Sequence, residues 1–206
     1  KALWQNGGVG LVSLFDAVDS LGVVTSLDMC SLDPATEAGC LDWEDILKRT
    51  LAHVDFFVPS IEELAYMLNR PLYNRLTESE DSMSELSLSV DIQNLADKVC
   101  SLGASNILIK CGAAGFYYRF SSMQKVAGKM GKDFSLWSGR CGFEKSYLPD
   151  QYVSGTGAGD TTIAAFLACC NRGYSLERTL SLASAAGALC VSSADALGSL
   201  TSLEDM

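Results

Sequence analysis

Helix-like and strand-like hydrophobic patterns alternate along most of the chain. Apolar residues recur at helical spacing across residues 9–21, and short apolar runs predict strands over 23–27, 54–58 and 106–110. These strands are apolar throughout, and segments with helical spacing separate them. The pattern predicts a single α/β domain over residues 1–206, in which helices flank a mostly parallel sheet.

Polar start and stop signals divide the rest of the chain. Ser60 and Glu63 have the spacing of a capping box, which opens a helix that runs to Leu68. The remaining expected elements are helices at 43–51, 92–102, 158–171 and 176–190, a turn at 111–115 followed by a strand at 116–118, and short strands or turns at 133–152. Residues 73–90 predict an exposed acidic loop, and residues 123–132 predict a loop of basic character.

Composition narrows the class of protein. A chain of 206 residues, 48% hydrophobic and 19% charged, is long and apolar enough to form a folded domain with a real core. Its formal net charge is -10 without any basic cluster, which argues against nucleic acid as a partner. No stretch reaches the roughly 20 apolar residues that cross a bilayer, so we expect no membrane span.

Cysteine usage indicates the compartment. The chain has 8 cysteines without a Cys-x-x-Cys pair and only 1 histidine, so a zinc site is not expected. Scattered apolar thiols indicate a reducing compartment, which we expect to be the cytoplasm. The chain begins with Lys1 rather than Met, so we expect the natural N-terminus to be absent, which leaves organelle targeting open.

The most informative stretch is the glycine run, residues 155–160 with the sequence GTGAGD, which leads into an apolar helical pattern. Glycines let backbone N–H groups approach a phosphate closely, and the helix start adds unpaired N–H donors with a partial positive charge. Because a carboxylate repels phosphate, Asp160 is better explained as a base for an attacking hydroxyl. The glycine run therefore indicates phosphoryl-transfer chemistry.

The glycine run differs from the better-known phosphate loops. No Lys follows its glycines as a Walker loop requires, and the third glycine of the dinucleotide fingerprint Gly-x-Gly-x-x-Gly is absent. A plain structural explanation is a glycine turn capped by Asp160, because Asp is a favoured N-cap. On the run alone, both a phosphate site and a capped turn stay open.

Three other polar clusters follow the predicted strands: Asp28, residues 60–63 and residues 110–115. Ligands of α/β folds bind beyond the C-terminal ends of the strands. We therefore expect these clusters and the glycine run to meet at one edge of the sheet. Four polar clusters at one edge are more than a capped turn predicts, so the phosphate site is favoured.

These residues resemble a known family. From about residue 22 to residue 200, the chain is similar to the C-terminal two-thirds of PfkB-type (ribokinase-like) carbohydrate kinases, and the glycine run resembles their C-terminal signature. The resemblance implies a ribokinase-like three-layer sandwich. It also implies that Asp160 is the catalytic base at the substrate, and that the amides of Gly157, Ala158 and Gly159 form an anion hole.

Residues 58–64 resemble the family's Asn-x-x-Glu motif, which organises Mg²⁺ and phosphate. Glu63 takes the place of the Glu and is implied as the metal residue, whereas Ser60 stands where the family has Asn. A capping box explains Ser60 equally well, and Glu63 can do both jobs. Asp28 lies where many relatives carry an Asp-Pro-Asn-like strand end, so it is implied at the substrate; alternatively, it is a polar residue that closes a strand.

Residues 110–115 resemble the family's Lys-x-Gly-x-x-Gly turn beside the nucleotide, although an ordinary tight hairpin also explains them. Ala194 falls where the family borders adenine and, in some members, a monovalent cation such as K⁺. Small residues at 183 and 185–188 permit close approach by a neighbouring element or a flat ligand. The implied nucleotide contacts are Lys110, Gly112, Gly115, Thr156, Gly157, Gly159 and Ala194.

The resemblance implies a kinase that uses ATP and Mg²⁺ to phosphorylate a hydroxyl of a sugar or sugar-like substrate. The alternatives are an adenosine-type nucleoside kinase of the same fold and a catalytically silent relative that binds or regulates, which the altered Ser60 favours slightly. The family's N-terminal part, with its sugar-binding motif and lid sheet, is not in this sequence. Relatives often pair through that lid, so the resemblance leaves a homodimer open without fixing the oligomeric state.

Overall fold

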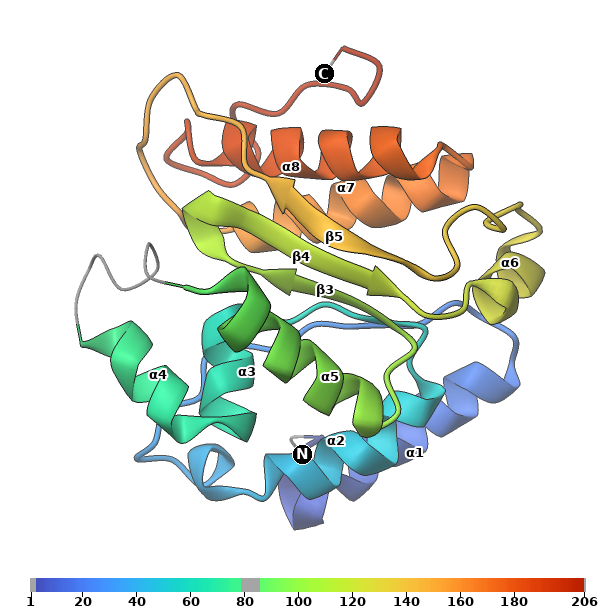
Figure 1. The fold of residues 1–206 in the computed structure, drawn as a ribbon, viewed down its shortest axis with the longest axis vertical. Helices are drawn as coiled ribbons and strands as arrows, with labels where there is room; N and C mark the ends of the chain where they lie inside the picture. The colour runs from blue at the N-terminus through green and yellow to red at the C-terminus, as the bar shows by residue number, and fades with distance from the viewer. Residues whose placement is uncertain (1–2, 79–85, 206) are drawn as a thin grey trace.

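The computed structural model describes residues 3–78 and 86–205, which fold around one five-stranded sheet (Figure 1). The strands lie in the order β1-β2-β3-β4-β5. Neighbours β1, β2 and β3 run parallel, whereas β4 pairs antiparallel with both β3 and β5. The strands are β1 (Ser26–Leu27), β2 (Phe56–Phe57), β3 (Asn106–Lys110), β4 (Gly115–Phe120) and β5 (Arg140–Lys145).

The α/β class is confirmed, and the sheet is mixed rather than mostly parallel. The expected strands 23–27 and 54–58 contract to two paired residues each, in β1 and β2. A tight turn of Gly112–Ala114 sends the chain straight back from β3 into β4. A connection that short permits only antiparallel pairing, because a parallel neighbour needs a crossover of a dozen or more residues.

Helices cover both faces of the sheet and make three layers (Figure 1). One face carries α1 (Gln5–Ser20), α2 (Trp43–Thr50), α3 (Ile61–Leu68) and α5 (Gln93–Ser101), with α4 (Arg70–Thr77) beside α3. The other face carries α7 (Ala158–Arg172) and α8 (Leu176–Cys190), and α6 (Gln124–Met130) lies at one end of the sheet. Short 3-10 turns at Ala38–Cys40 and Leu51–His53 join these elements.

Alternation along the strands divides the apolar residues into two cores. In β3, Ile107 and Ile109 pack with the first group of helices, whereas Leu108 packs on the opposite side against Phe120 and Phe166. All five side chains are fully buried. A strand buried on both faces needs apolar residues at every position, which explains the unbroken apolar run.

Part of the expected acidic loop, residues 73–90, is helical instead. Helix α4 covers residues 70–77, and a π-helical turn, Leu88–Ile92, leads into α5. The side chain of Asn69 accepts a hydrogen bond from the Leu72 amide at 3.2 Å, Pro71 sits in the first turn, and Leu76 is buried. The N-cap and the buried apolar side chains of α4 stabilise a helix here despite the polar composition of the segment. Residues 79–85 lie outside the described residues.

The expected basic loop at 123–132 is also wrong in part, because α6 occupies residues 124–130. Its buried Val126 anchors it to the sheet, and Gly131 ends it in the left-handed conformation with φ 63°. Two lysines of this stretch, Lys125 and Lys129, make ion pairs with Asp19 and Asp55. They form the charge cluster, which is defined as Asp19, Asp55, Lys125 and Lys129.

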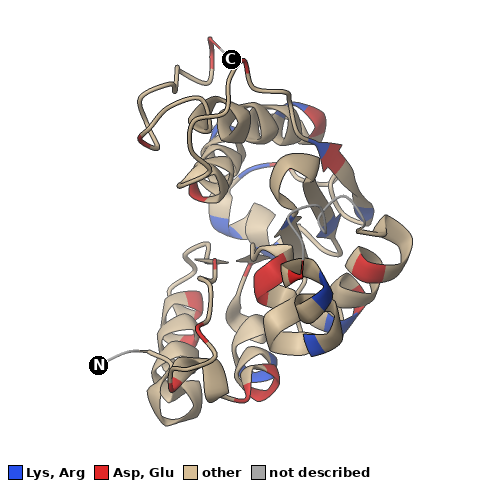
Figure 2. Ribbon diagram, turned by 90° about the vertical axis from the view of Figure 1, so that its left-hand side faces the viewer, with Lys and Arg blue, Asp and Glu red and all other residues tan. Residues whose placement is uncertain are grey.

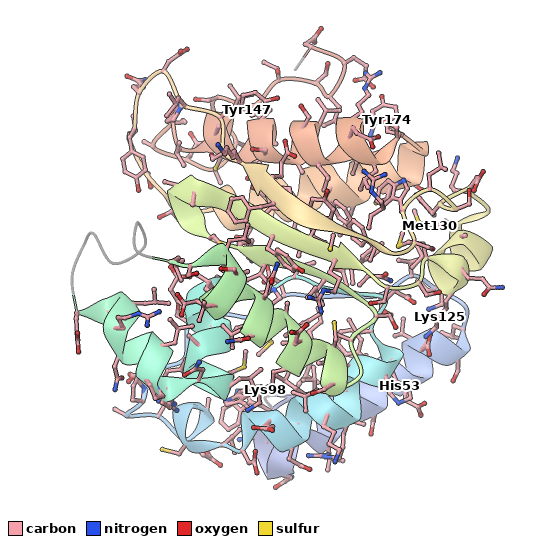
Figure 3. All side chains as sticks on the ribbon, in the orientation of Figure 1. His53, Lys98, Lys125, Met130, Tyr147 and Tyr174 are labelled. Carbon is pink, nitrogen blue, oxygen red and sulfur yellow. The ribbon has the colours of Figure 1, made fainter. Side chains whose placement is uncertain are left out.

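The charge cluster ties α6 to α1 and to the start of β2. Lys129 Nζ lies 2.7 Å from Asp19 Oδ1 and 2.6 Å from Asp55 Oδ2, and Lys125 Nζ lies 2.7 Å from Asp19 Oδ1. Asp55 is buried and also accepts a hydrogen bond from the Thr25 amide at 2.9 Å. Figure 3 shows Lys125 and His53 on the side of the molecule where α6 and α1 meet.

The charge cluster predicts acid sensitivity. Hydrogen bonds from Lys125 and then Lys129 lower the pKa of Asp19 from 3.8 to about 2. A lowered pKa stabilises the fold where the group is ionised, so this contribution is complete above about pH 4 and is lost as the pH falls to about 2. Urea midpoints measured across this window should fall more steeply for the wild type than for Asp19→Asn. Equal slopes for the two proteins would contradict the assignment.

Within residues 3–78 and 86–205, no helix is both long and apolar enough to cross a membrane. Charged residues of both signs are interspersed over the elements seen in Figure 2, and the basic residues do not gather on one element. The absence of a nucleic-acid partner stays a prediction from composition.

Candidate active site

Three strands bring their polar C-terminal segments to the same edge of the sheet. β1 is followed by Asp28, β2 by Ser60, and β3 ends at Lys110. Ser60 and Lys110 pair in parallel beyond the named strands, and the Lys110 amide donates to the Pro59 carbonyl at 2.9 Å. The expected convergence of the strand-end clusters is therefore present.

The glycine run forms the turn into α7. Gly157 is the N-cap with φ 82°, a left-handed conformation that favours glycine, and Asp160 occupies the third helical position. The cap makes no side-chain hydrogen bond, so Asp160 does not cap the helix, contrary to the plain structural explanation. The carboxylate of Asp160 is exposed.

The first turn of α7 offers free backbone donors. The Ala158 amide donates to the Gly155 carbonyl at 3.3 Å, and the Thr161 amide donates to the Gly157 carbonyl at 2.8 Å. Within the described part of the chain, the amides of Gly159 and Asp160 have no hydrogen-bond acceptor. Two free N–H groups at a helix N-terminus make an anion site, because the helix dipole adds a partial positive charge there.

A cavity of about 600 Å³ joins the turn of α7 to the strand ends. Among the described residues, its walls contain the carboxylates of Glu62, Glu63 and Asp160 and one basic residue, Lys110. The predicted site residues that line the cavity are Glu63, Lys110, Gly112, Gly115, Gly157, Ala158, Gly159 and Asp160. A cavity of this size can hold a small-molecule ligand.

Ser60 and Glu63 form the expected capping box of α3. The Glu63 amide donates to Ser60 Oγ at 3.2 Å, and the Ser60 amide donates to Glu63 Oε2 at 2.7 Å. This arrangement explains Ser60 as a helix cap. Because Glu63 Oε1 takes no part in the box, Glu63 can hold the helix start and still present an oxygen to the cavity.

Asp28 and Lys110 meet each other although they are 82 positions apart in sequence. Lys110 Nζ lies 2.7 Å from Asp28 Oδ1 and 2.5 Å from Asp28 Oδ2. Both side chains are mostly buried, with 14% of Lys110 and 28% of Asp28 exposed. Next to this pair, burial raises the pKa of the Cys111 thiol to about 12, which keeps the thiol protonated and unreactive.

Comparison with known protein families decides the assignment. The family model described as pfkB family carbohydrate kinase matches residues 12–203, which is most of the chain. The chain belongs to the pfkB family. A comparison with curated proteins gave no match.

Solved structures share the fold of this pfkB-family chain. The ribokinase of Arabidopsis thaliana, complexed with ribose and ATP, is 24% identical with a TM-score of 0.64, over 94% of this chain and 49% of its own. A candidate ribokinase II from E. coli, in complex with ATP and Mg²⁺, is 22% identical with a TM-score of 0.61. The match covers 98% of this chain and 54% of the E. coli chain. A nucleoside kinase of Burkholderia thailandensis, in complex with inosine, is 16% identical with a TM-score of 0.60. The match covers 96% of this chain and 50% of the Burkholderia chain. The chain thus spans about half the length of these proteins.

Two implied nucleotide residues of the pfkB-family chain lie outside the cavity walls. Thr156 is exposed, and its carbonyl accepts a hydrogen bond from the Cys190 thiol at 3.7 Å. Ala194 is exposed in the turn after α8, where its neighbour Ala196 lies against Gly157 instead. These two contacts stay predictions that the cavity itself does not support.

Sequence reasoning missed some cavity residues. Glu62 lines the cavity, although its motif at 58–64 gave it no role. Its place as the second residue of a helix that starts at a strand end was a usable signal. Tyr147 lies beside α8 (Figure 3), and its hydroxyl is 2.7 Å from Ser181 Oγ. Gly187 of α8 both lines the cavity and packs closely against Thr162 of α7, in agreement with the thin helix wall expected there.

The donor set of the cavity suits Mg²⁺ that keeps several waters. Glu62 and Glu63 supply carboxylate oxygens, which Mg²⁺ prefers. The described residues contain no group of three His, Cys, Asp or Glu side chains able to hold a metal by themselves. Such a metal would therefore be completed by water and phosphate oxygens, as is usual where nucleotides are bound.

Gly157 gives a testable prediction about the anion turn. A β-carbon at position 157 would lie 2.5 Å from Ala196 Cβ, and φ 82° strains any other residue, so Gly157→Ala must move the turn. A displacement near 1 Å can lower kcat/KM by about a hundredfold. Steady-state kinetics of the full-length protein measures it. Gly128→Ala on α6 is the matched control, because the space around Gly128 is open, and a similar loss in both variants would contradict the prediction.

Proposed function

We propose that this pfkB-family protein is an ATP-dependent kinase that phosphorylates a hydroxyl of a sugar or sugar-like substrate. One observation carries the proposal: the exposed carboxylate of Asp160 shares a cavity with the first turn of α7, where the amides of Gly159 and Asp160 are free within the described residues. Free donors can hold a phosphoryl group while the carboxylate beside them accepts a proton.

The chemistry assigns each group a step. The substrate hydroxyl oxygen forms a bond to the γ-phosphorus as the bond to the β–γ bridging oxygen breaks, and ADP leaves with that electron pair. Asp160 accepts the proton that the hydroxyl loses. The free amides of Gly159 and Asp160 in the α7 turn stabilise the charge on the transferring phosphoryl oxygens because they are already oriented.

Glu63 would hold Mg²⁺, which would supply positive charge to neutralise the phosphates. The protein itself contributes the fixed carboxylate, since the capping box holds one oxygen of Glu63 and leaves the other toward the cavity. The E. coli relative with ATP and Mg²⁺ supports this pairing of cofactors by analogy. We propose no residue set for a monovalent cation such as K⁺ beyond the expectation at Ala194.

The acceptor is the open part of the proposal. The Arabidopsis relative carries ribose and the Burkholderia relative carries inosine, so a nucleoside is the second candidate acceptor. The chain covers about half of either protein.

We also propose a reducing, cytoplasmic location, which the free thiols at all eight cysteine positions support. The homodimer stays a prediction.

The experiment that tests the function is ATP consumption by the full-length protein against a panel of sugars and nucleosides, with Mg²⁺ present. We expect ADP to form only when one class of acceptor is added. Clear nucleotide binding without turnover for any acceptor would contradict the kinase and favour a silent relative.

A further inference from the structure

Lys110 lies beside the first turn of α7, where the described residues leave two backbone amides free. A β-carbon built at Gly159 would be 3.2 Å from Lys110 Cδ and 3.5 Å from Lys110 Nζ, so the ammonium group lies directly over the first turn of α7. This position is on the cavity wall, beside the free amides of Gly159 and Asp160. A side chain at position 159 would therefore crowd the lysine, which would have to shift by a few tenths of an ångström.

The charge balance of the cavity makes this lysine important. Among the described residues, Glu62, Glu63 and Asp160 are the acidic residues of the cavity wall, and Lys110 is its single basic residue. A triphosphate that enters such a cavity brings further negative charge. Apart from metal ions and backbone amides, Lys110 is the group of the wall that can compensate it.

The ammonium group of Lys110 already forms an ion pair within the protein. Asp28 holds the ammonium through both carboxylate oxygens, at 2.7 and 2.5 Å. The lysine reaches Asp28 from the end of β3 across the end of β2, since β2 lies between β1 and β3. Asp28 is not among the described residues that line the cavity, whereas Lys110 is.

We propose that Lys110 is a catalytic residue that exchanges its contact with Asp28 for the γ-phosphoryl group of bound ATP. This inference rests on the proposed function and adds a residue to it. Asp28 is then a positioning residue, which holds the ammonium over the α7 turn before the nucleotide arrives. The positive charge of Lys110 stabilises the oxygens of the transferring group.

The two variants of the pair should have opposite effects on ATP binding. Lys110→Met removes the γ-phosphate contact, so the Kd of ATP should rise about tenfold while the Kd of ADP changes little. Asp28→Asn removes the competing carboxylate, so ATP should bind more tightly relative to ADP. A purely structural ion pair predicts instead that both variants weaken ATP and ADP alike, because both break the same contact.

Calorimetric Kd values for ATP and ADP with Mg²⁺, measured on the full-length protein, test this inference. Lys110→Arg keeps the charge and should keep most of the preference for ATP over ADP; Lys98→Met, a surface lysine paired with Glu44, is the control. In the same variants, kcat should fall by about a hundredfold for Lys110→Met. Equal losses for ATP and ADP in Lys110→Met would overturn the role of Lys110. Failure of the wild type to bind either nucleotide would instead overturn the proposed function and this inference with it.

Discussion

Asp160→Asn should lower kcat by roughly a hundredfold to ten-thousandfold while the Kd of ATP stays within a few-fold of the wild type. The amide keeps the shape of the side chain but cannot accept the proton of the attacking hydroxyl. Because Asp160 is exposed at the third position of α7 and caps nothing, the substitution leaves the turn of Gly157 intact. Steady-state kinetics and ATP titration of the full-length protein measure the two quantities.

A matched control separates loss of the base from a general effect of charge. Asp133→Asn removes an exposed carboxylate outside the cavity wall and should leave kcat unchanged. Near-normal turnover by Asp160→Asn with a proven substrate would contradict the base assignment. A parallel loss of ATP binding would also contradict it, because a base acts mainly in the transition state.

Asp55→Ala should destabilise the protein by about 3–5 kcal/mol, the second large effect we expect. Asp55 is buried and pairs with Lys129, of which only 8% is exposed. Its removal leaves the lysine with one paired carboxylate, Asp19, among the described residues, and leaves the Thr25 amide without its acceptor at 2.9 Å. The mostly buried ammonium group of Lys129 then has too little negative charge beside it.

Equilibrium urea unfolding measures the free energy of unfolding for Asp55→Ala and its control. Glu204→Gln breaks an exposed pair with Arg172, 3.4 Å apart, and should cost less than about 1 kcal/mol. Active-site function should survive in the folded fraction of Asp55→Ala, since the charge cluster does not line the cavity. A loss no larger than that of the control would show that the charge cluster contributes little.

Local patterns were sufficient to predict most of what lies at the strand ends. The apolar run of β3 requires a strand buried on both faces, and the Ser60–Glu63 spacing specifies its own cap. Glycines before an apolar helix predict the free amides of α7 because the first turn of any helix lacks intrahelical acceptors. Convergence then follows from parallel pairing of β1, β2 and β3.

Other features depend on contacts between distant segments, which no local pattern specifies. Helix α4 and helix α6 sit in polar stretches, and each is held by one or two buried side chains such as Leu76 and Val126. The ion pair of Asp28 with Lys110 joins two strand ends separated by a third. Each residue alone suggested a ligand contact, and only the fold shows that they bind each other.

We propose above that this pfkB-family protein transfers a phosphoryl group with Asp160 as base. The most direct measurement uses ATP with a radioactive γ-phosphate, the full-length protein and the acceptor that stimulates ADP formation. If Asp160 is the base, we expect the label on the acceptor hydroxyl with the wild type and almost none there with Asp160→Asn. Equal labelling by both proteins, or release of the label only as inorganic phosphate, would contradict the account.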